Sequence, residues 1–290
     1  MTRPPLDVAA LRPALLEPTG PLARVDVVAT AASTNTDLVA RARAGAEIPA
    51  ALVAEHQQAG RGRAGRAWET PARAALTVSF LLRPHVAADE LGWMPLLTGL
   101  ALARTLRAEG VRAQVKWPND VLLPAPTAVE GLGRFRKVAG VLAEVVPDAA
   151  PVTAPGDPGD ADDAPVVVVG VGLNVDQRAE EMPVPTATSV ALAGRDLDRG
   201  ELLVGLTGEL FTLVARWEAA GGDAVEAGLA GEYAEVSATL GRTVRAELAG
   251  GAGSVEGEAV RVADDGALVL ATATGERVVT AGDVHHLRRV

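Results

Sequence analysis

The chain has 290 residues, of which 48% are hydrophobic and 22% charged, a composition typical of a globular protein long enough for two domains. The 37 acidic residues outnumber the 27 basic ones by ten, which argues against a general binder of nucleic acids or anionic membranes, because such proteins carry basic surfaces. The chain has no cysteine, which excludes disulfides, thiol catalysis and cysteine-ligated metals.

The N-terminal region shows no targeting signal. Residues 1–22 contain five prolines and no unbroken apolar stretch, so we expect no signal peptide. The longest apolar-leaning run, 91–103, is shorter than the roughly 20 residues that a membrane helix needs. We therefore expect a soluble, cytoplasmic protein that makes no contact with a membrane.

Alternating strands and helices are predicted through the first 237 residues, from β-branched runs and from apolar residues at helical spacing. The predicted strands are 24–30, 51–55, 75–82, 114–123, 137–146 and 166–171. The predicted helices are 33–45, 91–109, 189–194, 201–220 and 223–237. Loops are predicted at 57–71, which is rich in glycine and arginine, and at 124–136.

Changes in composition indicate the domain organisation. After Gly241, short strands are predicted between glycine turns, at 243–248, 257–262, 267–270 and 277–280, which is typical of a small β-barrel. We therefore predict an N-terminal tail (1–22), a larger domain (23–237) and a C-terminal barrel (238–290). The segment 147–165 holds five aspartates and no basic residue, and we expect it to be a disordered acidic insertion.

Lysine and asparagine are rare in this chain. The 27 basic residues include only two lysines, and the only three asparagines are Asn35, Asn119 and Asn174. An ammonium or a neutral amide at a site is not freely replaced by arginine or aspartate. Chance would scatter these five residues, but all of them lie in segments that suggest a site on separate grounds.

The most distinctive segment is the loop from Gly60 to Trp68. Its three glycines allow a ligand to approach the backbone, and Arg61, Arg63 and Arg66 concentrate positive charge. The loop lacks the ending of a phosphate-binding P-loop. It suits an anionic ligand, with Trp68 available to pack on a planar base; the alternative is a solvated basic turn.

Four other segments carry candidate site residues, each with a structural alternative. Lys116 to Asp120 reads as a strand stopped by proline that presents an amide and a carboxylate, or as a simple Asx-turn. Lys137 opens an apolar strand and is either an edge residue or a charge aimed into a pocket. Gly170 to Asn174 ends a buried strand with Gly-x-Gly, which also occurs at bulges. Ser33-Thr34-Asn35 is most simply a helix cap.

Together these segments predict one chemistry. A basic glycine-rich loop, lysines, a carboxylate and amides suit a nucleotide with an anionic co-substrate, and the natural reaction is attack by a carboxylate on the α-phosphate of ATP. Both partners are anionic, so the site has to supply positive charge and exclude water from the mixed anhydride.

The same segments resemble the hallmarks of the biotin protein ligases, namely a GRGRxGR-x-W loop, KWPND, K-x-AG and GxGxN. All four occur here in that order, at 60–68, 116–120, 137–141 and 170–174. The resemblance implies an α+β fold, a class II synthetase-like catalytic domain with a mixed, largely antiparallel sheet, followed by an SH3-like barrel. It also implies that the enzyme activates biotin as biotinyl-5′-AMP and transfers it to a lysine of a biotin carboxyl carrier domain.

The resemblance also implies roles for individual residues. Its implied biotin-binding residues are Ser33, Thr34, Asn35, Gln57, Gly60, Arg61 and Lys137. Its implied nucleotide-binding residues are Arg63, Arg66, Trp68, Asn119 and Asn174. Its implied catalytic residues are Lys116, Lys137, Arg63 and Asp120. Asp120 would also bind Mg²⁺ or accept the proton of the attacking lysine.

The resemblance further implies ATP with Mg²⁺, no tightly bound prosthetic group, and a monomer or weak homodimer. Only about 22 residues precede the first predicted strand, so we expect a ligase without a DNA-binding domain. Two alternatives stay open: a relative that transfers lipoate or octanoate, and a biotin-responsive regulator. The first would lack the GRGRxGR loop, and the second would need a DNA-binding element.

Overall fold

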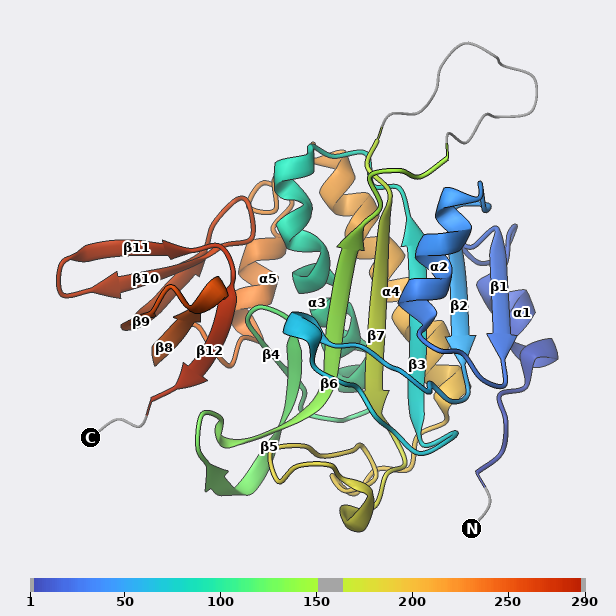
Figure 1. Cartoon of the computed structure of the whole chain (residues 1–290), viewed down its shortest axis with the longest axis horizontal. Coiled ribbons are helices and arrows are strands. Elements are labelled where there is room, and N and C mark those ends of the chain that lie inside the picture. The colour runs from blue at the N-terminus through green and yellow to red at the C-terminus, as the bar shows by residue number, and fades with distance from the viewer. Residues whose placement is uncertain (1–2, 151–163, 288–290) are drawn as a thin grey trace.

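The computed structural model describes residues 3–150 and 164–287, and its centre is a seven-stranded mixed sheet (Figure 1). The strands lie in the order β1-β2-β3-β7-β6-β5-β4, with β1 parallel to β2 and all other neighbours antiparallel. Their bounds are Arg24–Val28 (β1), Ala50–Ala54 (β2), Ala75–Leu82 (β3), Gln114–Lys116 (β4), Asp120–Val129 (β5), Gly133–Val145 (β6) and Val167–Asn174 (β7). The predicted α+β fold with a mixed, largely antiparallel sheet is confirmed.

Helices cover both faces of this sheet (Figure 1). The α-helices are Val8–Leu15 (α1), Thr34–Arg43 (α2), Met94–Ala108 (α3), Arg199–Ala219 (α4) and Leu229–Glu235 (α5). Short 3₁₀ helices are Arg63–Gly65 (η1), Ala88–Trp93 (η2), Ala179–Glu181 (η3) and Ala249–Gly251 (η4). Apolar residues of α2 form a small cluster with one face of the sheet, whereas α3 and α4 form the main core on the other. None of the described helices is long and apolar enough to cross a membrane.

The N-terminal segment, expected as a tail, packs on the rest of the chain. It contains α1, an element that was not predicted, and Leu6, Leu15 and Leu22 are buried in the main core. Asp7 caps α1 by accepting hydrogen bonds from two backbone N–H groups. Burial of three leucines fixes this segment, and the local proline content gave no sign of that.

Three further predictions about elements were wrong. The strand predicted at 114–123 is two strands, β4 and β5, separated by a turn at 117–119. The loop predicted at 124–136 is a hairpin, since β5 continues to Val129. β4 pairs with β5 only as far as Leu122, so beyond it β5 pairs with β6 alone and has an open edge, where proline is tolerated. The helix predicted at 189–194 is a single turn.

A second, antiparallel sheet forms the C-terminal domain, beside the β4 edge of the first (Figure 1). Its strands are Thr243–Leu248 (β8), Ser254–Val262 (β9), Leu268–Thr272 (β10), Gly275–Val279 (β11) and Gly282–His286 (β12), in the order β11-β10-β9-β8-β12. Among the described residues the two edge strands do not pair, so the barrel is not closed. Trp93 and Trp117 of the larger domain donate hydrogen bonds to backbone carbonyls of this domain. Residues 151–163 of the predicted acidic insertion lie outside the described residues.

Candidate active site

A cavity of about 610 Å³ opens on the sheet face next to α2. Side chains alternate along β7, so its valines 167, 169 and 171 face the main core while Gly170, Gly172 and Asn174 share the cavity face. A Cβ atom on Gly170 would lie 2.1 Å from Asn35 Oδ1, and one on Gly172 would lie 2.4 Å from the Trp68 ring. The two glycines therefore make room for the groups that line the cavity.

Neutral polar side chains form one end of the cavity. Ser33 is the N-cap residue of α2, and Thr34 donates from both its N–H and its hydroxyl to Gln57 Oε1, at 2.8 and 3.1 Å. Ser79 Oγ on β3 lies 2.7 Å from Thr34 Oγ1 and donates to Asn35 Oδ1 at 2.6 Å. Ser33, Thr34, Asn35 and Ser79 are buried, Gln57 is half-buried, and their hydrogen bonds offset the cost of lost hydration.

Asn35 connects this end of the cavity to β6. Its Nδ2 donates to the carbonyl of Leu142 at 3.1 Å and to Glu144 Oε2 at 2.8 Å. The same Glu144 carboxylate lies 3.0 Å from Nη2 of Arg61, on the glycine-rich loop. Both ends of the Asn35 amide are therefore engaged by the protein, and Asn35 positions its neighbours.

The loop from Gly60 to Trp68 lies along the cavity and reaches both domains. Arg66 forms an ion pair with Asp283 of β12. Within the loop, the backbone N–H of Trp68 donates to the Gly60 carbonyl at 2.9 Å. A Cβ on Gly60 would lie 2.3 Å from the Trp68 carbonyl oxygen, so this position needs glycine for a close backbone approach. The indole of Trp68 stands over Gly172, and the Lys137 ammonium lies 5.7 Å from its ring centroid.

Charged side chains gather at the opposite end of the cavity, around the turn between β4 and β5. Asp120 is paired with both lysines of the chain: its Oδ1 lies 2.6 Å from Lys137 Nζ and its Oδ2 lies 3.7 Å from Lys116 Nζ. Arg63 reaches over from the loop, and its Nη1 lies 3.4 Å from Asn119 Oδ1. Three cations thus surround one carboxylate, leaving a net positive charge for an anionic ligand.

The charges of this cluster depend on one another. Burial alone would raise the pKa of Asp120, but the two lysines outweigh it and hold that pKa below its usual value. Burial lowers the pKa of Lys116, against the attraction of Asp120, and burial also lowers the pKa of Arg63. Asp120 therefore stays ionised, and its negative charge stabilises the charged form of Lys116. Because its pKa is low, Asp120 is a poor acceptor for the proton of an attacking amine.

Two asparagines flank this cluster. Asn119 donates from Nδ2 to the Val141 carbonyl at 2.7 Å. Asn174 donates to the Thr188 carbonyl at 2.9 Å and accepts from Gln177 Nε2 at 2.8 Å. Each amide is fixed by the protein, so both asparagines shape the cavity wall whether or not they contact a ligand.

The predicted Mg²⁺ role of Asp120 does not fit the structure. Among the described residues there is no group of three histidine, cysteine, aspartate or glutamate side chains that could hold a metal. Both oxygens of Asp120 are already engaged by lysines. A protein-held Mg²⁺ would normally need one or two free carboxylates. We therefore assign no Mg²⁺ ligand among residues 3–150 and 164–287.

The cavity brings together all the predicted site residues except Gly60. Its lining includes Ser33, Thr34, Asn35, Gln57, Arg61, Arg63, Arg66, Trp68, Lys116, Asn119, Asp120, Lys137 and Asn174. Gly60 does not line the cavity, but it allows the close backbone contact that holds Trp68. Their individual roles toward biotin and the nucleotide stay predictions.

Sequence reasoning missed four residues that build this site. Ser79 and Glu144 hold Asn35, Gln177 holds Asn174, and Asp283 holds Arg66. Ser79 could have been noticed as a polar residue in an apolar strand, and Glu144 because it shares a strand face with Gly140. Nothing local marks Gln177 or Asp283, which meet their partners only through the fold.

Family models match both domains. One described as "Biotin/lipoate A/B protein ligase family" matches residues 28–154, and one described as "Biotin protein ligase C terminal domain" matches residues 239–287. The second match covers the C-terminal sheet, which agrees with the two-domain organisation.

Relatives and solved structures agree with these matches. The chain is 40% identical to the biotin–[acetyl-CoA-carboxylase] ligase of Mycobacterium tuberculosis, over 99% of this chain and 97% of that one. It is 34% identical to the bifunctional ligase/repressor BirA of Escherichia coli, over 59% of this chain and 47% of that one. The structure of the biotin protein ligase from Aquifex aeolicus in complex with biotin and ATP matches with a TM-score of 0.70 and 26% identity, over 92% of this chain and 100% of that one. The chain belongs to the biotin protein ligase family and is an enzyme of the ligase class.

Proposed function

We propose that the protein activates biotin with ATP to form biotinyl-5′-AMP and transfers the biotinyl group to a specific lysine of a biotin carboxyl carrier domain. The relatives support this proposal through the acetyl-CoA carboxylase in their name and through the biotin and ATP of the related solved structure. The observation that carries it is the cavity itself, with a neutral hydrogen-bonded end and a cationic end.

In the first step a biotin carboxylate oxygen attacks the α-phosphorus of ATP, and pyrophosphate leaves. Two anions have to meet, so the barrier falls only if positive charge is concentrated where charge builds up in the transition state. Lys137, Lys116 and Arg63 supply that charge around the cavity. The neutral end, with Thr34 and Gln57, then receives the biotin ring system.

In the second step the neutral amine of the carrier lysine attacks the biotinyl carbonyl, an amide bond forms and AMP leaves with the bonding electron pair. The amine loses a proton in this step. Asp120 is a poor acceptor because its pKa is depressed, so the leaving phosphate or water is the better acceptor. The loop from Gly60 to Trp68 would keep water from the anhydride before the carrier arrives.

Mg²⁺ would enter with the phosphates of ATP, where it offsets their charge. The described residues offer it no cluster of ligands. Our mechanism therefore assigns the protein's share of the charge to its lysines and arginines.

The proposal is tested by incubating the chain with biotin, MgATP and a carrier domain, and following the intact mass of the carrier. We expect the addition of one biotinyl group, dependent on ATP and absent when the acceptor lysine is changed to arginine. Modification with lipoate or octanoate but not with biotin would favour the lipoate-type alternative. Retention of operator-like DNA at physiological salt would favour the regulator.

A further inference from the structure

The segment 175–187 walls the cavity on the side of Asn174. Its residues that line the cavity are Gln177, Glu181, Met182, Pro183, Val184, Thr186 and Ala187. The segment is also hydrogen-bonded to β6 at Lys137. The Lys137 backbone N–H donates to the Thr186 carbonyl at 2.8 Å, and the Thr188 N–H donates to the Lys137 carbonyl at 2.9 Å. Displacement of this wall would therefore disturb both Asn174 and Lys137.

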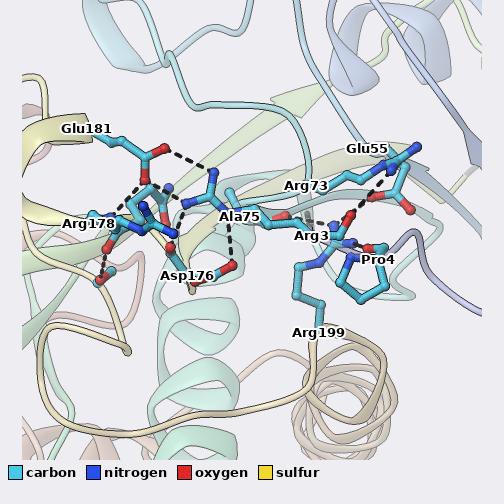
Figure 2. A network of polar contacts seen from close by, with 11 residues as sticks. Arg3, Pro4, Glu55, Arg73, Ala75, Asp176, Arg178, Glu181 and Arg199 are labelled. Atoms are coloured by element: carbon cyan, nitrogen blue, oxygen red, sulfur yellow. Dashed lines mark hydrogen bonds and ion pairs between the residues drawn. The ribbon is translucent and has the colours of Figure 1, made fainter. Parts of the chain in front are cut away.

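The side chain of Arg3, in the N-terminal segment, forms hydrogen bonds and ion pairs with this wall (Figure 2). Its Nε lies 2.8 Å from Asp176 Oδ2, and its Nη2 donates to the Asp176 carbonyl at 2.7 Å. Its Nη1 and Nη2 donate to the two carboxylate oxygens of Glu181 at 3.1 and 2.6 Å. The guanidinium thus bridges the beginning of the segment to η3, and its side chain is only 16% exposed.

The charge state of Glu181 favours the same arrangement. The hydrogen bond from Arg3, helped by the Arg178 N–H, lowers the pKa of Glu181 to about 2. Glu181 therefore stays ionised, and the pair persists, at any pH at which the enzyme would work.

The N-terminal segment has its own anchor, separate from the wall. Arg199 of α4 and Glu55 form a buried ion pair at 2.6 Å. Arg199 Nη2 also donates to the Pro4 carbonyl at 2.8 Å, and the Leu6 N–H donates to Glu55 Oε1 at 2.6 Å (Figure 2). Residues 4–6 are thus bound to the body of the domain, and Arg3 reaches from this fixed base to the wall.

We propose that Arg3 is a positioning residue that holds the wall 175–187 in the arrangement that receives ATP. The inference rests on the proposed function, because it assigns Arg3 to the nucleotide side of the same cavity. A wall that is already ordered loses less conformational entropy when a ligand binds, so removing its clamp weakens binding on that side. Of the predicted biotin residues only Lys137 bonds to this wall, through its backbone; the others lie at the start of α2 or after β2, which Arg3 does not touch.

The test compares Arg3→Ala with the wild-type chain in pyrophosphate release. We expect the KM for ATP to rise about tenfold in the variant, while the KM for biotin stays within about twofold. Arg12→Ala, which removes an exposed arginine from the same N-terminal segment, is the matched control and should change neither constant. A purely structural role would lower the thermal midpoint and the amount of active enzyme without separating the two KM values.

A double-mutant cycle sharpens the test. If Arg3 acts through Glu181, then Glu181→Gln should raise the KM for ATP as well, and the double variant should be little worse than either single variant. An unchanged KM for ATP in folded Arg3→Ala, or equal rises for ATP and biotin, would overturn the inference. Absence of biotin-dependent pyrophosphate release from the wild-type chain would instead overturn the proposed function.

Discussion

The two ends of the cavity are built on different principles. At the neutral end, Thr34 donates to Gln57, Ser79 donates to Asn35, and Asn35 donates to β6, so these side chains are held in place before any ligand arrives. At the cationic end, three positive side chains surround Asp120, and the hydrogen bonds of Arg63 to Asn119 and to the Gly282 carbonyl are long, at 3.4 Å.

In the proposed reaction, the neutral end would bind biotin and the cationic end would promote formation of the adenylate. A neutral, rigid end suits a ligand that is bound equally well before and during reaction, whereas concentrated charge is most valuable where negative charge builds up. Substitutions at the neutral end should therefore affect stability and biotin affinity. Substitutions at the cationic end should act mainly on the rate.

The largest effect is expected for Lys137→Ala. Loss of the ammonium beside the reacting phosphate should slow adenylate formation by about 10³-fold, with only a moderate loss of biotin affinity. Pyrophosphate release and equilibrium biotin binding measure the two effects. Arg136→Ala is the control, because Arg136 is next to Lys137 in the chain but its side chain bonds to Thr127 and does not line the cavity. Pyrophosphate release at the wild-type rate would contradict the role of Lys137.

Arg63→Gly should have the next largest effect. Weakening the contact between the loop and the phosphate should release biotinyl-5′-AMP about 10- to 100-fold faster, since one charge-assisted hydrogen bond is lost. The escaped adenylate would label added proteins at their lysines, which a blot for biotin detects. Arg245→Ala, in a surface pair with Glu256, is the charge-matched control. Unchanged retention of the adenylate would show that Arg63 does not close the site.

Asn35→Ala tests the neutral end. The substitution removes the hydrogen bonds of Asn35 to Ser79, to the Leu142 carbonyl and to Glu144, which should lower the free energy of unfolding by roughly 2 kcal/mol. Urea denaturation measures this loss, and the KM for biotin should rise in the same variant. An Asn35→Ala protein of wild-type stability would contradict the contrast between the two ends.

The smallest effect is expected from pH, at the cationic side. Burial, followed by the nearby Lys116 and Arg242, lowers the pKa of His286 to about 4. Between about pH 6.5 and 4 the unfolded chain binds a proton at His286 that the folded chain does not, so stability falls as the pH falls, by up to about 1.4 kcal/mol per pH unit. Denaturation at pH 7 and pH 5 measures the slope. If the free energy of unfolding depended on pH as steeply in a His286→Phe variant as in the wild-type chain, His286 would not be the cause of this pH dependence.

Much of this site could be predicted from the sequence because the informative residues are local and rare. The rare Lys116 and Asn119 mark the turn before β5, and the alternation of Gly170, Gly172 and Asn174 places three positions on one face of β7. The C-terminal strands followed from apolar patterning between glycine turns, and the mixed sheet followed from the family resemblance.

The rest depends on contacts between distant parts of the chain. Arg3 meets Asp176 and Glu181 only once the larger domain has folded, and Arg66 meets Asp283 only where the two domains join. β12 was missed because its apolar pattern is weak and its position is fixed by pairing with β8. The hairpin of β5 and β6 was read as a loop because its prolines argue locally against a strand.

The scarcity of lysine has a consequence for an enzyme that makes an acylating agent. Arginine keeps its proton under all ordinary conditions and is not a nucleophile, so the 25 arginines of this chain supply charge without offering a target. The only side-chain amines, Lys116 and Lys137, are both paired with Asp120. A variant that leaks its mixed anhydride should therefore label surrounding proteins while its own intact mass stays almost unmarked, which would make it a durable reagent for tagging neighbours.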